Sequence, residues 1–278
     1  MKSYKKGITA FISVYNEEVR IENCLSVFKW CNEIILIDKY SNDKTVEKAK
    51  LFNNVKIIQI ENDDNTFSKE MSIFLSECTT EWFISITASD LIHKELADEI
   101  VKVVHSIEVN YDTISIPYRG YMMGQYNKYS PWYAEYANKI LKTDSVRINY
   151  NKVHCVITSN AKSIYKIIIN DKKIAFYHLT HENVESVINR YVRYWKSEAY
   201  TNTSLREDYF FIIKKFIQLL FIKKSFFQKS EVIALSFSFL SYYMLAYVYK
   251  WDKTNNKSNI IYNDIRLEIR KSWKLKAK

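Results

Sequence analysis

The chain has 278 residues, with Lys+Arg 41, Asp+Glu 31 and a formal net charge of +10. This length allows one large α/β domain, alone or with an appended helical part, and a hydrophobic content of 47% excludes wholesale disorder. The excess of positive charge favours an anionic partner, such as a phosphate-bearing substrate, a membrane surface or nucleic acid. Because no aromatic-and-basic RNA-binding motif accompanies the lysines, we do not expect nucleic acid to be a partner.

The cysteines and the N-terminus indicate a cytoplasmic protein. Cys24, Cys31, Cys78 and Cys155 are scattered without a C-x-x-C pair, so we expect reduced thiols and no zinc site. The N-terminal basic residues are followed by an apolar run that leads directly into charged residues, without a cleavage site. We therefore interpret this run as a first strand and not as a signal peptide.

The first 120 residues alternate between strand-like and helical patterns. This alternation predicts a parallel sheet with right-handed crossovers and helices on both faces. The near-continuous apolar run at residues 33–38 is typical of a strand buried on both faces. The predicted strands are residues 7–15, 33–38, 55–60, 82–86 and 112–119, and the predicted helices are residues 17–31, 43–52, 68–78 and 94–107.

Polar clusters follow the predicted strands, and they read "NEE", "DKYSND", "ENDDN" and "TASD" in chain order. Ligands of parallel sheets bind beyond the carboxyl ends of the strands. We therefore expect the functional site in these clusters.

The pattern is weaker from Gly120 to Tyr177, where residues 120–142 are rich in Tyr and Trp and short strands are expected within residues 145–160 and 163–179. Residues 183–200 predict a helix with Asn183 as its N-cap. The predicted buried face of this helix consists of Val184, Val187, Ile188, Tyr191, Val192 and Trp195.

The C-terminal part combines large apolar side chains with paired lysines. Residues 232–249 form an uncharged run of 18 residues that contains three serines and four tyrosines, whereas a membrane span needs about 20 predominantly apolar residues. One interpretation is a core helix of a soluble domain. The flanking lysines and the basic tail favour the other, an interfacial helix on an anionic membrane leaflet.

Three common nucleotide-binding and hydrolytic motifs are missing. No G-x-G-x-x-G follows the first strand, and neither G-x-x-x-x-G-K-[ST] nor G-x-S-x-G occurs. These absences count against a dinucleotide-binding enzyme, a P-loop enzyme and an α/β-hydrolase.

The ends of the first two strands carry a different set of groups. "FISVYNEEVRIENCL" brings a hydroxyl, an aromatic ring, an amide and an acid to a strand end, and "LIDKYSNDKT" places Asp38 at the same edge of the sheet. A carboxylate there can accept a hydrogen bond from a nucleobase N–H or a ribose hydroxyl, and Tyr15 can contact a base face. Taken singly, Asp38 and Asp43 can equally be turn or capping residues.

Together, these segments resemble the opening of the family-2 inverting glycosyltransferases, which read "YNEE" after the first strand and "VDxxSxDxT" after the second. "EWFISITASD" falls where the family carries "xWxLxLDADE". Later segments, including "SPWYAEYANKILK" and "FYHLTHENVESVINRYVRYW", resemble the small lipopolysaccharide-core members. The resemblance covers nearly the whole chain and is densest from Ile8 to Asp90.

The resemblance implies a GT-A fold, which is a Rossmann-like, mixed and mainly parallel sheet flanked by helices, here with a C-terminal helical extension. Residues 1–200 would form the glycosyltransferase domain, with a nucleotide-sugar half at 1–118 and an acceptor half at 119–200. Residues 201–278 would form a helical, basic and membrane-associated region.

The resemblance also implies roles for single residues. The expected nucleotide-binding residues for a UDP-sugar are Ser13, Tyr15, Asn16, Glu17, Asp38 and Lys69. Ser89, Asp90 and His178 would lie at the diphosphate or metal, Asp90 and His154 would be catalytic, and Trp132, Tyr133 and Arg190 would bind the acceptor. We interpret His181 and Tyr191 as structural residues.

The sequence departs from the family where a divalent cation is expected. Inverting transfer needs a base and a cation, often Mg²⁺ or Mn²⁺, at the leaving diphosphate. Thr87 and Ser89 replace two acids, and Cys155 replaces a third; two hydroxyls and Asp90 make a poor cage for such an ion.

Three explanations remain open. The diphosphate is held without metal by cationic side chains, for which His154, His178, Lys69 and Arg119 are candidates. Alternatively, a metal binds weakly through Asp90, His178 and the nucleotide phosphates. In the third case the chain is a catalytically degenerate nucleotide-sugar-binding or scaffolding subunit of a glycan assembly complex.

We predict a hexosyltransferase-type enzyme that moves a sugar from a nucleotide sugar to a cell-surface glycan or a lipid-linked acceptor, with inversion. The basic, apolar C-terminal part predicts a cytoplasmic protein that is peripheral at the inner face of the cell membrane.

Overall fold

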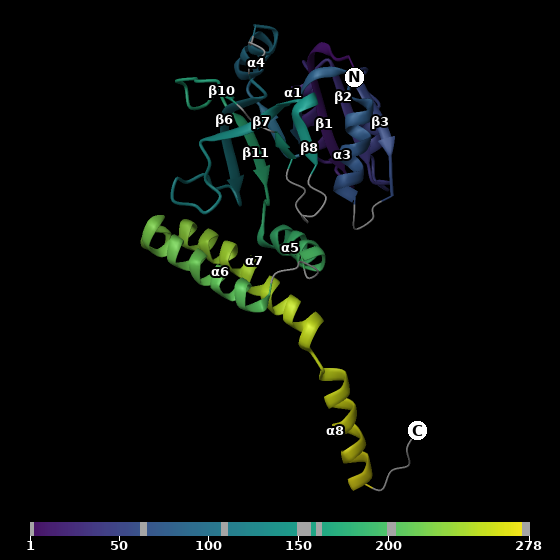
Figure 1. The fold of residues 1–278 in the computed structure, drawn as a ribbon, viewed down its shortest axis with the longest axis vertical. Helices are drawn as coiled ribbons and strands as arrows, with labels where there is room; N and C mark the ends of the chain where they lie inside the picture. Colours follow the sequence, from purple (N-terminus) through teal and green to yellow (C-terminus); the bar gives the residue numbers. More distant parts are fainter. Residues whose placement is uncertain are drawn as a thin grey trace.

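A mixed, mainly parallel sheet forms the centre of the protein (Figure 1). The structure, a computed structural model, describes residues 3–61, 66–106, 111–148, 157–159, 163–198 and 204–273. The strands of the large sheet are β1 (Lys5–Val14), β2 (Glu33–Asp38), β3 (Val55–Gln59), β4 (Thr80–Ile86), β5 (Asp90–Ile92), β6 (Thr113–Met122), β7 (Tyr136–Lys142), β10 (Ile164–Lys166) and β11 (Phe176–Thr180). Their order is β3-β2-β1-β4-β7-β6-β11-β5, with β10 also paired to β6.

The first four strands in this order are parallel to one another, and β7 runs antiparallel to both β4 and β6. Beyond β7, β11 lies parallel to β6 and antiparallel to β5. β8 (Val146–Ile148) and β9 (Ile157–Ser159) form a separate two-stranded sheet.

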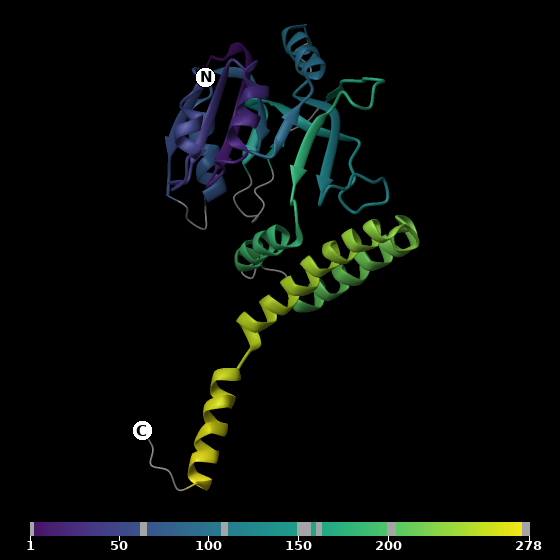
Figure 2. The ribbon, with the colours of Figure 1, turned by 180° about the vertical axis from the view of Figure 1, so that it is seen from behind.

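Helices cover both faces of the sheet (Figures 1 and 2). They are α1 (Ile21–Phe28), α2 (Thr45–Ala49), α3 (Thr66–Glu77) and α4 (Lys94–Ser106). Alternate residues of a strand point to opposite faces, so Ile8 and Ile12 of β1 join the core under α1, α2 and α4. Phe11, between them, packs on the other face against Phe74 of α3, with ring centroids 4.9 Å apart. The predicted α/β class, with a mixed and mainly parallel sheet, is confirmed.

The structure differs from the predicted elements at the strand ends. The helix predicted from residue 17 begins only at Ile21, because Glu17 and Glu18 belong to a loop held by side chains of the next loop. β5 and β7 were not predicted. β5 has three residues, which is too short to show an alternating pattern, and β7 lies in the Tyr-rich stretch whose pattern is weak.

A helical region follows β11, as predicted. Its helices are α5 (Val184–Glu198), α6 (Leu205–Ile217), α7 (Ser230–Asn255) and α8 (Ser258–Ser272). Figure 1 shows α5 beneath the carboxyl ends of the strands, α6 and α7 side by side next to it and running obliquely, and α8 projecting away from the body. Lys250 Nζ at the end of α7 pairs with Asp208 Oδ2 at the start of α6 at 2.9 Å, so these two helices are antiparallel.

The predicted N-cap of α5 is confirmed, since the Ser186 amide donates to Asn183 Oδ1 at 2.9 Å. The predicted buried face is only partly correct. Val187, Tyr191 and Trp195 pack against Met122 of β6 and Leu235 of α7. Val192 is partly buried against the same cluster. By contrast, Val184 and Ile188 are 50% and 49% exposed, because α7 covers only a narrow stripe of this helix.

Gly7 is the glycine on which the start of β1 depends. Its φ is +144°, and a Cβ there would lie 2.3 Å from Asn32 Oδ1, the oxygen that accepts the Ile8 amide at 2.9 Å. We expect Gly7→Ala to lower the free energy of unfolding by about 2 kcal/mol through strain and a broken hydrogen bond. Urea denaturation measures this loss.

Gly124→Ala is the matched control. Gly124 also has a positive φ, +72°, but no atom lies within 4 Å of a Cβ built there. Only the left-handed backbone penalty, about 1 kcal/mol, is expected. An equal or smaller loss for Gly7→Ala would contradict the proposed clash.

Candidate active site

The loops that follow β1 and β2 are locked together by hydrogen bonds. The Asn16 amide donates to Ser41 Oγ at 2.9 Å, and Asn16 Oδ1 accepts from the Asn42 amide at 2.9 Å. Asn16 and Tyr40 both have φ of +56°, a backbone region that non-glycine residues rarely adopt. The two loops therefore hold each other in uncommon conformations at the carboxyl edge of the sheet.

Acidic and hydroxyl side chains make further hydrogen bonds between these two loops. The Glu17 amide donates to Thr45 Oγ1 at 2.7 Å, and the Glu18 amide donates to Asp43 Oδ2 at 3.1 Å. In return, the Lys44 amide donates to Glu18 Oε2 at 3.0 Å. Burial acts to raise the pKa of Asp43, but the hydrogen bonds from Thr45 and the Glu18 amide outweigh it and hold that pKa below its ordinary value. Asp43 thus stays ionised and accepts hydrogen bonds that hold the two loops together.

A cavity of about 680 Å³ opens beside the first of these loops. We call it the loop cavity. One wall comes from the loop after β1, and the other comes from the start of α5 and the residues before it. Its lining residues are Tyr15, Asn16, Glu17, Val19, Arg20, His181, Glu182, Asn183, Ser186, Asn189 and Arg190.

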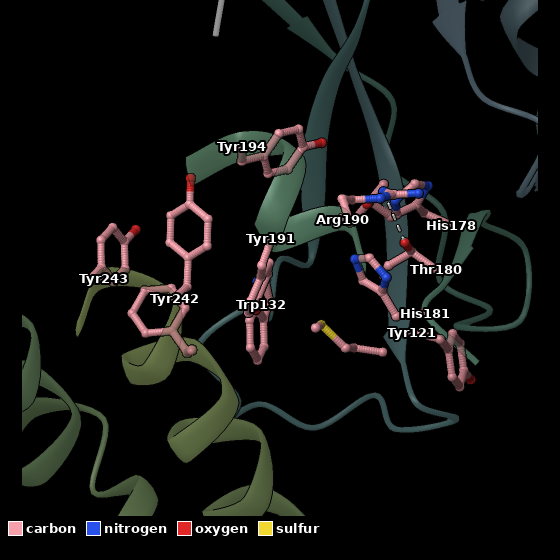
Figure 3. A pocket seen from close by; sticks show the side chains of 14 residues that line it. Tyr121, Trp132, His178, Thr180, His181, Arg190, Tyr191, Tyr194, Tyr242 and Tyr243 are labelled. Carbon is pink, nitrogen blue, oxygen red and sulfur yellow. Dashed lines mark hydrogen bonds between the residues drawn. The ribbon is translucent and has the colours of Figure 1, made fainter. Parts of the chain in front are cut away.

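A second cavity, of about 500 Å³, lies between β6, β11, α5 and α7 (Figure 3). We call it the aromatic cavity, because eight of its lining residues are Tyr, Trp or Phe. The lining consists of Tyr118, Gly120, Tyr121, Met122, Trp132, His178, Thr180, His181, Arg190, Tyr191, Tyr194, Phe239, Tyr242 and Tyr243.

His181 and Arg190 line both cavities, so the two spaces adjoin. Arg190 Nη1 contacts Thr180 Oγ1 at 3.4 Å (Figure 3), and no ion pair joins Arg190 to a carboxylate in the described part of the chain. Burial, followed by the charges of Arg190 and His178, lowers the pKa of His181 to about 4. His181 is therefore a neutral imidazole at neutral pH, whereas Arg190 keeps a positive charge at the junction.

Asp90 and His178 form a pair at the wall of the aromatic cavity. They are register partners in the antiparallel pairing of β5 and β11, and His178 Nδ1 lies 2.5 Å from Asp90 Oδ1. Asp90 is fully buried, and its Oδ2 accepts the Thr87 amide at 2.7 Å. Burial, with a smaller effect of the Asp90 charge, raises the pKa of the neighbouring Tyr118 hydroxyl.

The residues around Asp90 do not fit a divalent cation. Both Asp90 oxygens already accept hydrogen bonds, and the hydroxyls of Thr87 and Ser89 are bonded to each other at 2.9 Å. Such a cation prefers several oxygen ligands, with carboxylates foremost. Among the residues that the structure describes, no group of three or more His, Cys, Asp or Glu side chains is arranged to hold a metal ion.

The structure brings some of the predicted nucleotide-binding residues together and separates others. Tyr15, Asn16 and Glu17 line the loop cavity, whereas its described lining does not include Ser13, Lys69 or Asp38. Asp38 is fully buried and accepts the Ser41 amide and Gln59 Nε2 (2.9 Å). In this structure its carboxylate stabilises the loop after β2.

The predicted acceptor-binding residues lie in two different cavities. Trp132 and Arg190 line the aromatic cavity, but Tyr133 lines a different cavity on the outer side of β6. Arg119, a candidate for the diphosphate, also points into that outer cavity. His154 and Cys155 lie outside the described residues.

Sequence reasoning missed His181 as a site residue and did not consider Arg20. His181 has φ of +54°, and a non-glycine residue in this region is a recognised mark of functional sites. No sequence pattern shows that conformation. Arg20 follows "NEEV" directly, so its place beside the first loop could have been inferred from its position.

The model of glycosyl transferase family 2 matches residues 9–163, more than half of the chain. The chain therefore belongs to glycosyl transferase family 2, and its sheet and flanking helices form the GT-A fold of that family. The family-level resemblance read from the motifs is confirmed.

Individual relatives are similar over part of their length. The SPbeta prophage-derived glycosyltransferase SunS of Bacillus subtilis is 40% identical over 120 residues, which are 42% of this chain and 28% of that protein. An uncharacterized glycosyltransferase of Rickettsia typhi is 29% identical over 209 residues, 69% of this chain and 66% of that protein. The chain thus spans 28% of the first of these relatives and 66% of the second. Among solved structures, S. aureus TarS 1-349 in complex with UDP-GlcNAc has 16% identity and a TM-score of 0.47, over 86% of this chain and 81% of that chain.

The low pKa of His181 predicts a pH dependence of stability. Since the folded-state pKa is about 4 and the ordinary value is 6.5, the unfolded chain binds this proton first as the pH falls. The contribution of neutral His181 is complete above pH 6.5 and is lost as the pH falls toward 4. We expect His181→Asn, which tolerates the left-handed backbone, to lose less stability across this window than the wild type. Urea denaturation at a series of pH values measures the difference.

The control is His105→Asn, since His105 is an exposed histidine on α4. It should follow the wild-type curve. If the stability of His181→Asn falls as steeply with pH as that of the wild type, the partly buried imidazole of His181 does not cause the pH dependence.

Proposed function

We propose that this protein transfers a sugar from a nucleotide sugar, with a UDP-sugar as the expected donor, to a hydroxyl of a glycan or lipid-linked acceptor. The observation that carries the proposal is the pair of adjoining cavities. The loop cavity would hold the nucleotide, the aromatic cavity would hold the acceptor, and His181 and Arg190 lie at their junction. Membership of a glycosyltransferase family supports the reaction class.

The loop cavity has the groups that a nucleotide needs. Tyr15 is 43% exposed and lines it, so its ring is free to contact a nucleobase. Asn16 and Glu17 supply polar groups from a loop whose backbone is already fixed by its hydrogen bonds to the loop after β2. A preformed loop reduces the ordering cost of binding.

The reaction would be a single displacement with inversion. The acceptor oxygen forms a bond to the anomeric carbon, the bond from that carbon to the diphosphate oxygen breaks, and its electron pair leaves with the diphosphate. The acceptor proton passes to a base. We assign this role to His178, whose Nδ1 is held by Asp90, which leaves Nε2 as the nitrogen that can receive the proton.

Asp90 would act through His178 and not on the substrate. Its oxygens are buried and occupied, so it orients the imidazole and stabilises the cation that forms when the proton arrives. A buried carboxylate beside a catalytic histidine has the same two effects in serine proteases.

Arg190 would neutralise the leaving diphosphate in place of a divalent cation. A guanidinium binds phosphate oxygens through two parallel hydrogen bonds. Within the described residues no carboxylate competes for Arg190. Arg20 also lines the loop cavity, but Glu17 Oε2 accepts from its Nε at 2.8 Å, so its charge is already partly balanced.

A binding and turnover experiment tests this function. We expect UDP or a UDP-sugar to raise the melting temperature, and donor turnover to continue in EDTA. His178→Gln should lower kcat roughly 10²–10⁴-fold, since it removes the base, while nucleotide stabilisation stays unchanged. Release of UDP from a panel of UDP-sugars measures turnover.

His105→Gln, on the exposed side of α4, is the control and should keep wild-type activity. No stabilisation by any nucleotide or nucleotide sugar would reject donor binding. Stabilisation without turnover on any acceptor would instead favour the scaffolding subunit, and loss of turnover in EDTA would favour a metal-dependent enzyme.

We further propose that the enzyme works at an anionic membrane surface. By length and composition, α7 is long and apolar enough to cross a membrane. Only 22% of its most apolar 18-residue stretch is buried. The exposed side of α6 carries Tyr209, Phe210, Ile213, Phe216 and Ile217. Monomeric soluble proteins rarely expose contiguous apolar patches of this kind.

Lysines adjoin this apolar surface, and they are Lys214, Lys215, Lys223, Lys224 and Lys229. Basic side chains beside an exposed apolar helix favour attachment to an anionic leaflet. This arrangement supports a peripheral position at the inner face of the cell membrane, where a lipid-linked acceptor would be within reach.

Vesicle binding tests the membrane proposal. We expect the protein to sediment with vesicles that contain an anionic lipid and much less with neutral vesicles, and added salt should weaken the binding. Phe210→Ser combined with Phe216→Ser should lower the partition at least 10-fold, because two large apolar side chains no longer enter the interface.

The matched control replaces two exposed apolar residues elsewhere, Leu51→Ser with Ile168→Ser, which are 71% and 74% exposed. It should bind vesicles as the wild type does. Equal binding by both double variants would reject α6 as the attachment surface.

A further inference from the structure

A third cavity, of about 360 Å³, lies on the outer side of β6, and we call it the basic cleft. Four cationic side chains line it, Arg119, Lys128, Lys172 and Lys173, against a single carboxylate, that of Glu135. Neither the proposed donor site nor the Asp90–His178 pair uses these residues. The excess of positive charge favours an anionic ligand.

Arg119 is the buried member of this set, with 8% exposure. Its Nη1 donates to the Tyr118 carbonyl at 2.8 Å and to Tyr126 Oη at 3.0 Å, which fixes the guanidinium. No carboxylate forms an ion pair with Arg119 among the residues described. Arginine is almost never fully buried without a paired charge, so a fixed and unpaired guanidinium points to a ligand that supplies the negative charge.

Tyrosine rings form the rest of the cleft. The rings of Tyr121 and Tyr177 are stacked with centroids 6.3 Å apart, and those of Tyr126 and Tyr133 lie 5.1 Å apart. Aromatic faces offer flat apolar surfaces on which sugar rings stack, and phenolic hydroxyls offer hydrogen bonds. The cleft thus combines cationic side chains with aromatic surfaces on which a carbohydrate chain can stack.

The cleft adjoins the aromatic cavity. Tyr121 lines both spaces, and Trp132 lines the aromatic cavity while its neighbour Tyr133 lines the cleft. A chain whose end lies beside His178 would pass over Tyr121 and continue into the cleft.

We propose that the basic cleft binds anionic groups on the non-reacting part of the acceptor, which would be a sugar chain that carries phosphate or carboxylate groups. Arg119 and the three lysines pair with these groups, and the tyrosines contact the chain between them. The role as an acceptor subsite rests on the proposed glycosyl transfer, whereas the binding of an anionic chain does not.

Titration calorimetry with three oligomers tests the cleft: inorganic polyphosphate, oligogalacturonate and neutral dextran. We expect the wild-type protein to bind one or both anionic oligomers and not dextran. Lys172→Glu with Lys173→Glu should weaken that binding at least 10-fold and flatten its salt dependence. Both lysines are exposed, so their replacement leaves the core intact.

The matched control is Lys29→Glu with Lys50→Glu, two exposed lysines away from the cleft with the same change of charge. It should bind as the wild type does. Binding of polyphosphate alone identifies phosphate as the recognised group, and binding of oligogalacturonate alone identifies carboxylate. Equal weakening by both double variants, equal affinity for dextran, or no binding of either anionic oligomer overturns the proposal.

The donor experiment separates this proposal from the proposed function. In Lys172→Glu with Lys173→Glu, nucleotide stabilisation should remain at the wild-type value. If this protein binds the anionic oligomers but no nucleotide or nucleotide sugar, the proposal for the cleft is supported and the proposed glycosyl transfer is rejected. Donor binding, together with unchanged binding of the anionic oligomers by the double lysine variant, would keep the proposed function and reject the cleft.

Discussion

The pairing of β11 with β6 on one side and β5 on the other decides where the site residues lie. In this register His178 stands between Gly120 and Asp90. Gly120 is needed there, because a Cβ would lie 2.9 Å from the Tyr118 ring, whose ring stacks beside His178 at 6.4 Å. A shift of one residue would turn every side chain of β11 to the opposite face. His178 would then lose Asp90.

The same strand connects the sheet to the helical region. β11 leads through His181 into α5, and α5 carries Arg190 to the junction of the two cavities. The contacts of Val187, Tyr191 and Trp195 with α7 hold α5 in place, and Trp195 Nε1 donates to the Tyr242 carbonyl at 2.9 Å. The helical region thus forms one wall of the aromatic cavity. Attachment of α6 and α7 to a membrane would therefore place that cavity close to the lipid surface.

The sequence predicts the first half of the fold well, because buried parallel strands such as β2 are continuous apolar runs with helical periods between them. It fails for β5 and β7. β5 has three residues, and β7 reads "YANKILK", in which Asn138 is next to Lys139 and Ile140 is next to Leu141, so polar and apolar residues do not alternate. Tertiary pairing with β11, β4 and β6 makes these strands, and no local pattern reports that pairing.

The site shows a similar division. Tyr15, Asn16 and Glu17 could be predicted because a contiguous motif carries them. The junction of His181 with Arg190 could not, since it depends on a left-handed backbone at His181 and on the turn that leads into α5. The motif residues also have a second use that the resemblance does not reveal. Asn16, Glu18 and Asp43 hold the two loops together, so their occurrence in the sequence reports loop geometry as well as any contact with a nucleotide.

The hydroxyl residues Thr87 and Ser89 suit the buried carboxylate of Asp90, which follows them at the start of β5. Acids at both positions would place two further negative charges beside Asp90, and like charges at this distance are stabilised only when a cation or a proton compensates them. With Thr87 and Ser89, the loop is neutral and its hydroxyls bond to each other. Asp90 is then free to pair with His178, which a metal ion would otherwise compete for. Under the proposed mechanism, the loop would support the His178 imidazole and would not bind a cation. The positive charge for a leaving diphosphate would then come from another element, and Arg190 of α5, which lines both cavities, is the residue we propose for it.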